Sequence, residues 1–260
     1  MNWFEAFVLG ILQGLTEFLP VSSSGHLEIG KALLGIELTD NLTFDLIVHA
    51  GTVCSTIVVF RKEILKLFSG LFKFSWNDET QYISKLIFSA IPVIFIGLFL
   101  ESFVEGLFNN NLFLVGCMLL ITAVLLAFTY FAKSRQKDVS FLDAFIIGIA
   151  QAVAVLPGMS RSGATIATAL LLKNKRENAA KFSFLMVLLP ILGKAVLDII
   201  RGKIVSNEVS FIPMLTGFIT SFLVGLFACT LMLNIVKKSK LIYFAIYCAV
   251  VAGLTIIFSW

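Results

Sequence analysis

Long apolar runs separated by short polar segments make up most of this chain. The six longest runs are each close to the roughly 20 residues that a helix needs to cross the hydrocarbon core of a bilayer. The pattern therefore predicts an all-α integral membrane protein with about six transmembrane helices. The runs cover residues 42–60, 86–103, 112–132, 182–200, 211–236 and 241–260.

Two further apolar segments, 4–34 and 141–172, are interrupted near their middles by proline and glycine. Each is long enough for two half-length helices, and we expect each to form a re-entrant hairpin. The distribution of charge supports this interpretation, because most Lys and Arg residues fall in segments 61–85, 133–137, 173–181 and 237–240, which the positive-inside rule places in the cytoplasm. Segment 141–172 must then enter and leave on the cytoplasmic side, whereas segment 4–34 enters from outside.

The two interrupted segments resemble each other at an offset of 138 residues, and three predicted spans follow each of them. Because three is odd, the halves, about 1–132 and 141–260, lie in opposite orientations within a single membrane domain, 1–260. This is an inverted-topology repeat, an arrangement that places ligand sites at broken helices near the membrane midplane. Chance similarity between two apolar segments is the alternative. The aligned pairs are Gly10 with Gly148, Ile11 with Ile149, Gln13 with Gln151, and Gly25 with Gly163.

Composition agrees with the membrane interpretation. The chain is 58% hydrophobic and 14% charged, whereas about a quarter of the residues of a soluble domain are charged. Too little polar sequence remains to cover a soluble helical bundle. The net charge of +4 lies in the loops and reflects topology, so no nucleic-acid partner is expected. The four cysteines stand singly in apolar segments, without metal-ligand spacing.

Polar and ionisable residues gather at the two interruptions, and such residues at membrane depth usually have a function. If the interruptions meet, Arg161 suits a phosphate group, since its fork donates to two oxygens at once. Glu17 fits a metal ligand or a general acid–base group, and Ser23 near His26 fits a nucleophile with its base. Hydroxyls and flexible glycines at the turns would bind phosphate oxygens. These phosphate-binding candidates are Ser22, Ser24, Gly25, Gly158, Ser160, Ser162 and Thr165.

Each of these residues also has a structural interpretation. Ser22 and Ser24 could simply cap helices at the chain break. His26 could hydrogen-bond within a polar pocket, and Arg161 could be an ion-pair partner of Glu17. Outside the interruptions, His49 lies four residues after Asp45, which predicts a local polar pair rather than a catalytic group.

The motifs "QGLTEFLPVSSSGH" and "LPGMSRSGAT" resemble the two signatures of the bacterial undecaprenyl-diphosphatase family, the bacitracin-resistance proteins. The resemblance implies hydrolysis of undecaprenyl diphosphate to undecaprenyl phosphate and inorganic phosphate, aided by a divalent cation, Mg²⁺ or Ca²⁺. It assigns catalytic roles to Glu17, Ser23, His26 and Arg161. Glu17 matches the second acidic position of the first motif, and this chain has Gln13 at the first, so metal binding would fall on Glu17 with Gln13.

The same resemblance implies a multi-pass protein of the bacterial cytoplasmic membrane, with its site facing the periplasm or cell exterior. The polyprenyl tail of the substrate would lie among membrane lipids, and the sequence leaves room for a homodimer. Two other classes of function stay open from sequence. A polyprenyl phosphate transporter or flippase would use the same inverted repeat, and a scaffold protein would need the polar cluster only for stability.

Overall fold

A computed structural model of the chain describes residues 1–36, 42–100, 104, 106, 111–132, 137–200, 210–238 and 240–258. Within these ranges the protein is helical, and its only β pairing is a single bridge between Lys137 and Asn174. The helices are α1 (Trp3–Phe18), α2 (Ser23–Leu34), α3 (Leu42–Val59), α4 (Arg61–Leu71), α5 (Asp78–Phe99), α7 (Leu112–Phe128), the 3₁₀ turn η2 (Thr129–Phe131), α8 (Phe141–Val153), α9 (Arg161–Leu171), α10 (Arg176–Met186), α11 (Leu188–Ile200), α12 (Phe211–Lys237) and α13 (Ile242–Ile257).

The first hairpin consists of α1 and α2, and local sequence sets its boundaries. Asn2 begins α1 with a capping box, in which its side chain accepts from the backbone N–H of Glu5. Helix α1 ends before Pro20, because proline disfavours helical backbone in the residue that precedes it. Ser22 caps α2, and Gly35 ends α2 in the left-handed conformation.

The second hairpin consists of α8 and α9, and it repeats this design. Ser140 begins α8 with a capping box to Asp143, and Ser160 caps α9. The outer ends of the two helices lie together. Lys137, before α8, forms a β-bridge with Asn174, after α9, and the Lys137 ammonium lies 2.8 Å from the Asp143 carboxylate. The chain therefore enters and leaves this hairpin at one end of the molecule.

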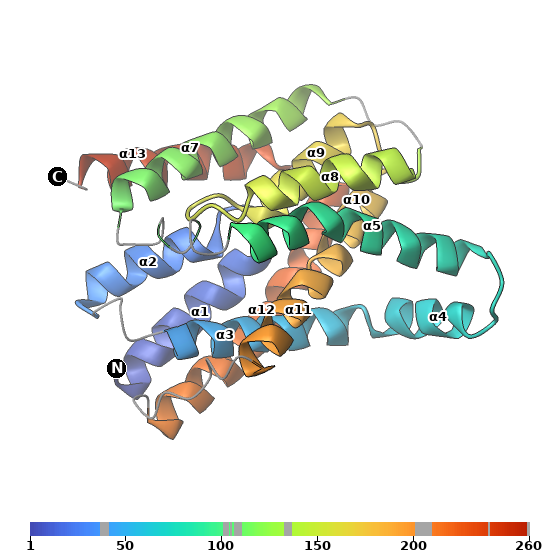
Figure 1. Cartoon of the computed structure of the whole chain (residues 1–260). Helices are drawn as coiled ribbons and strands as arrows, with labels where there is room; N and C mark the ends of the chain where they lie inside the picture. The colour runs from blue at the N-terminus through green and yellow to red at the C-terminus, as the bar shows by residue number, and fades with distance from the viewer. Residues whose placement is uncertain are drawn as a thin grey trace.

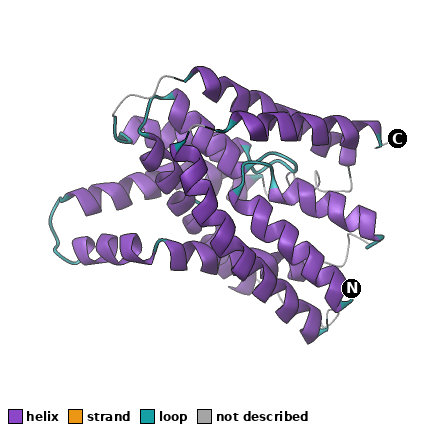
Figure 2. Ribbon diagram, turned by 180° about the vertical axis from the view of Figure 1, so that it is seen from behind, coloured by secondary structure: helices purple, strands orange, loops and turns teal. Residues whose placement is uncertain are grey.

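The remaining helices surround the hairpins (Figure 1). Helix α12 packs against both α1 and α3, α7 pairs with α13, and α5 packs along α8. The view from behind shows the loops between the hairpin arms in the interior of the bundle, away from both chain ends (Figure 2). Buried apolar side chains such as Phe18, Ile166 and Phe182 fill the space between these helices.

Three helical segments are long and apolar enough to cross a membrane: α5, α7 with η2, and α12. A fourth is available if α3 and α4, which meet at a bend of 72°, form one broken span. Large apolar side chains such as Phe95, Phe227 and Tyr243 are exposed on the outside, as expected for a surface in contact with lipid. The chain is thus an integral membrane protein, while the six spans remain a prediction.

One predicted span is not a single helix. Residues 182–200 are divided between α10, which ends at Met186, and α11, which begins at Leu188. The reason is Pro190, which cannot donate to the Met186 carbonyl and whose ring would clash with it. Residues 241–260 form the shorter helix α13, Ile242–Ile257, and residues 259–260 lie outside the described ranges.

Most of the basic segments identified in the sequence lie at one end of the bundle. Lys181 of α10 is 3.7 Å from Glu63 of α4, and Lys237 of α12 is 3.1 Å from Glu177 of α10. The predicted cluster at 133–137 is described only at Lys137, which lies at the same end. Figure 1 shows both chain termini at the opposite end.

Candidate active site

The inner ends of the two hairpins meet inside the bundle, as the sequence predicted for a shared cavity. The Ser162 hydroxyl donates to the Leu19 carbonyl across the contact at 3.3 Å. A methyl group added to Gly25 would lie 3.1 Å from Gly158 Cα, so the two turns touch through their glycines. Gly158 has φ +87°, and a Cβ there would lie 2.5 Å from the Val115 carbonyl oxygen. Only glycine fits this position without strain.

Glu17 lies at the centre of this contact, and both of its carboxylate oxygens are engaged. Arg161 Nη2 donates to Glu17 Oε1 at 3.1 Å, which joins the two hairpins by an ion pair. Ser23 Oγ donates to Glu17 Oε2 at 2.6 Å, and Gln13 Nε2 donates to the same oxygen at 3.0 Å. The structure therefore brings three of the four predicted catalytic side chains together, and the predicted ion pair of Glu17 with Arg161 is present.

The fourth, His26, is not paired with Ser23. Its Nδ1 donates to the Ser22 carbonyl at 2.8 Å, and its Nε2 lies 2.8 Å from the hydroxyl of Tyr247. The predicted Ser23–His26 pair is therefore wrong in this structure, because the start of α2 turns the imidazole toward α13 and the hydroxyl toward Glu17. His26 hydrogen-bonds within a polar pocket, which was its alternative interpretation.

The serines and the threonine predicted to bind phosphate divide into three groups. Ser22 and Ser160 are buried caps whose hydroxyls accept from the N–H groups of Gly25 and Gly163. Ser24 does not cap a helix, and its Oγ accepts from the Gly158 N–H at 3.5 Å. Only Ser162 and Thr165 line a cavity beside Arg161.

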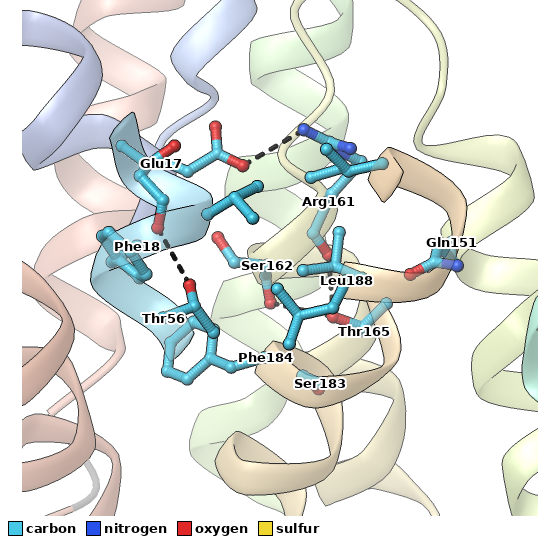
Figure 3. A pocket seen from close by; sticks show the side chains of 14 residues that line it. Glu17, Phe18, Thr56, Gln151, Arg161, Ser162, Thr165, Ser183, Phe184 and Leu188 are labelled. Atoms are coloured by element: carbon cyan, nitrogen blue, oxygen red, sulfur yellow. Dashed lines mark hydrogen bonds and ion pairs between the residues drawn. The ribbon is translucent and has the colours of Figure 1, made fainter. Parts of the chain in front are cut away.

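This cavity is narrow, with a volume of about 20 Å³. Figure 3 shows Glu17 and Arg161 facing each other across it, with Phe184 and Leu188 farther along. Apolar side chains thus continue the cavity from the ion pair toward the break between α10 and α11. The lining residues are Glu17, Phe18, Thr52, Val53, Thr56, Gln151, Arg161, Ser162, Thr165, Ser183, Phe184, Val187, Leu188 and Ile191.

Helix α3 supplies site residues that the sequence analysis did not identify. His49 Nε2 lies 3.6 Å from Glu17 Oε2, and its Nδ1 donates to the Asp45 carbonyl at 2.7 Å. The predicted local His49–Asp45 pair is therefore present, but it uses the Asp45 carbonyl, because the Asp45 carboxylate pairs with Lys31 at 2.7 Å. Thr52 lies 3.5 Å from Gln13 Nε2. The sequence signal for these site residues is that α3, although apolar, carries a polar residue in every turn.

A divalent cation can be tested against the oxygens near Glu17. Among the described residues, no three His, Cys, Asp or Glu side chains gather as a metal cluster. However, the buried Oε1 of Gln13 has no hydrogen-bond partner, and it lies on the side chain that contacts Glu17. Mg²⁺ is commonly held by one or two protein oxygens together with substrate phosphates. Glu17 and Gln13 fit this smaller role.

Comparison with known proteins finds relatives over almost the whole chain. Residues 6–254 match the family model described as bacitracin resistance protein BacA. A protein of Bacteroides thetaiotaomicron named undecaprenyl-diphosphatase is 55% identical over 100% of this chain and 99% of its own length. Proteins of the same name from Parabacteroides distasonis and Methanosphaera stadtmanae are 56% and 38% identical, covering 98% and 100% of this chain and 98% and 99% of their own lengths.

Proposed function

Because the chain belongs to the bacitracin resistance protein BacA family, we propose that it hydrolyses undecaprenyl diphosphate to undecaprenyl phosphate and inorganic phosphate. The observation that carries this proposal is the Glu17–Ser23–Arg161 cluster, built where two broken helices meet beside an apolar cavity. Release of the monophosphate recycles the lipid carrier of peptidoglycan synthesis. By removing the diphosphate, the protein confers resistance to bacitracin.

Ser23 is the nucleophile of the proposed reaction. Its hydroxyl already donates to Glu17 Oε2 at 2.6 Å, so Glu17 can accept the proton as Oγ attacks the terminal phosphorus. The new Oγ–P bond forms while the bond from that phosphorus to the bridging oxygen breaks, which releases undecaprenyl phosphate. Glu17 then gives this proton to the departing monophosphate. Ionised again, it accepts a proton from the water that cleaves the phosphoserine, which regenerates Ser23 and yields inorganic phosphate.

Arg161 supplies the positive charge that a diphosphate requires. Within the described residues its guanidinium makes one hydrogen bond, to Glu17, so its other N–H groups remain free for phosphate oxygens. Ser162 and Thr165 lie beside it along the cavity. The first isoprenyl units lie against Phe184, Leu188 and Ile191, which continue the cavity as an apolar surface.

A divalent cation, Mg²⁺ or Ca²⁺, would be held by Glu17 and Gln13 together with the substrate. It would supply charge neutralisation for the departing phosphate. Purified protein assayed with a chelator, and then with Mg²⁺ or Ca²⁺ restored, tests this assignment. Phosphate release that survives complete chelation would remove the cation from the proposal.

The proposed site opens to the outside of the bacterial cytoplasmic membrane. The first hairpin, with Glu17 and Ser23, starts at the end of the bundle opposite the basic segments, which the positive-inside rule places in the cytoplasm. The second hairpin returns to the basic end. These opposed directions support an inverted-topology repeat with two re-entrant hairpins.

A matched pair of serine variants tests the chemistry. We expect Ser23→Ala to abolish phosphate release from undecaprenyl diphosphate and to eliminate a trapped phospho-enzyme. Ser24→Ala, next in the chain but without contact to Glu17, is expected to keep most of the activity. Phospho-enzyme in Ser23→Ala would give the nucleophilic role to another residue. No release by the wild type with any cation would favour a lipid transporter, and lipid flipping in vesicles would then be measured.

A further inference from the structure

Two buried polar side chains in the cavity have no partner in the protein. Gln151 of α8 is 1% exposed, and neither its Nε2 nor its Oε1 has a hydrogen-bond partner among the described residues. Ser183 of α10 is 3% exposed, and its Oγ likewise has no partner. Both residues line the same cavity as Arg161 and Thr165 (Figure 3). Buried polar groups are nearly always satisfied, which indicates that something other than the chain satisfies these two.

The repeat explains why Gln151 is left without a partner. Its counterpart Gln13 donates to Glu17, four residues later on the same face of α1. The residue four positions after Gln151 is Val155, which offers no polar atom. The second hairpin therefore keeps the carboxamide and lacks the carboxylate that engages it in the first hairpin.

The donor and acceptor set indicates the ligand. Gln151 Nε2 and the free N–H groups of Arg161 donate, Gln151 Oε1 accepts, and Ser183 can do either. A fully ionised group would leave Gln151 Oε1 unsatisfied. A phosphate monoester, with a second pKa of about 6, or inorganic phosphate offers anionic oxygens and, when singly protonated, a hydroxyl that donates to Oε1.

We propose that Gln151 and Ser183, together with Arg161, form a second phosphoryl-binding subsite in this cavity. The inference rests on the proposed function, because it assigns this subsite to one of the two phosphorylated products or to the matching part of the substrate. The occupant is either the lipid-linked phosphate or the free inorganic phosphate. The same chemistry serves both, and kinetics separates them.

The experiment compares Gln151→Leu, Gln151→Glu and Ser183→Ala with wild type, in the full chain in detergent. Conversion of radiolabelled undecaprenyl diphosphate to the monophosphate gives kcat, KM and the inhibition constants of inorganic phosphate and of the lipid monophosphate. Tyr82→Phe is the matched control, because it also removes a buried hydroxyl without a partner but lies outside the cavity. Thermal unfolding reports the fold of each variant.

If the subsite holds the phosphate that becomes free, the inhibition constant of inorganic phosphate rises at least fivefold in the variants while that of the lipid monophosphate is unchanged. If it holds the lipid-linked phosphate, the inhibition constant of the lipid monophosphate rises instead. Gln151→Glu, which adds a negative charge, should have the largest effect in either case. Unchanged constants in all three variants would overturn the subsite and leave only ordered water at these atoms.

Failure of the proposed function would be visible separately, as a wild type that forms no monophosphate. In that case, equilibrium dialysis with labelled inorganic phosphate still tests the subsite in the same proteins. Binding by wild type that is weakened at least fivefold in Ser183→Ala and Gln151→Leu, but not in Tyr82→Phe, supports it. Equal binding by all of them, or none by the wild type, overturns it.

Discussion

The two hairpins share one construction and differ in the charge that they carry. In each hairpin, a serine caps the second helix and accepts from the N–H of a glycine three residues later, at 3.3 Å for Ser22 and 3.0 Å for Ser160. The first hairpin adds a carboxylate, Glu17, and the second adds a guanidinium, Arg161. The comparison teaches that the shared serine–glycine turn is a structural device, and that the residues proposed for the chemistry are those in which the hairpins differ.

The carboxylate side of this comparison gives the largest expected effect. We expect Glu17→Gln to lower kcat by about 10²–10⁴-fold, because the amide cannot accept the Ser23 proton. Phosphate release by the purified variant measures it. Thermal unfolding is the control for loss of fold, and activity within a few-fold of wild type would move proton transfer to another group.

Variants of Arg161 test the guanidinium side of the comparison between the two hairpins. Arg161→Ala should lower kcat/KM by about 10²–10³-fold, since a donor to the developing charge is lost and Glu17 loses its cation. Arg161→Lys should recover only part of this, because an ammonium lacks the planar fork of the guanidinium. Full activity in the lysine variant would mean that charge alone suffices at this position.

Gly158→Ala tests how tightly the turn of the second hairpin is packed. The positive φ of Gly158 and the nearby Val115 carbonyl predict a loss of about 1–3 kcal/mol in the free energy of unfolding. Gly253→Ala in α13 is the control, because an added methyl there meets nothing within 4 Å. Denaturant unfolding in detergent measures both. A Gly158→Ala variant as stable as wild type would show that the second turn can shift away from Val115 at little cost.

The smallest effect is expected at Tyr247. Tyr247→Phe removes the hydroxyl that bonds His26 Nε2, and it should cost about 0.5–1.5 kcal/mol of stability while kcat stays close to wild type. Unfolding and phosphate release are measured on the same preparation. A fall in kcat as large as that of Glu17→Gln would return His26 to the catalytic group.

Much of the site was predictable from the sequence. The spacing of Gln13 and Glu17 places them on one face of α1, and the structure joins their side chains at 3.0 Å. Pro20 and Pro157 marked the interruptions, and their meeting was expected from the repeat. These features depend on local backbone preference and on a similarity within the chain, both of which the sequence contains.

The partners of His26 and His49 could not be predicted in the same way. Tyr247 is 221 residues from His26 in the chain, and no local pattern joins them. His49 reaches Glu17 because α3 and α1 both pack against α12. Such contacts depend on how whole helices pack, which spacing within one helix does not reveal. The spacing within α3 therefore predicted Asp45, and not Glu17, as the partner of His49.

The Glu17–Arg161 ion pair spans 144 positions, and this separation has a consequence for biosynthesis. As the protein emerges from the ribosome, Glu17 enters the membrane long before the helix that carries its counter-charge. An unpaired carboxylate is costly in hydrocarbon, so the early half must keep it protonated, hydrated or held by His49 until α9 arrives. The order of translation thus makes completion of the proposed active site the same event as pairing of this carboxylate with Arg161. A chain that stops before α8 is expected to be a substrate for membrane proteolysis rather than a stable half-protein.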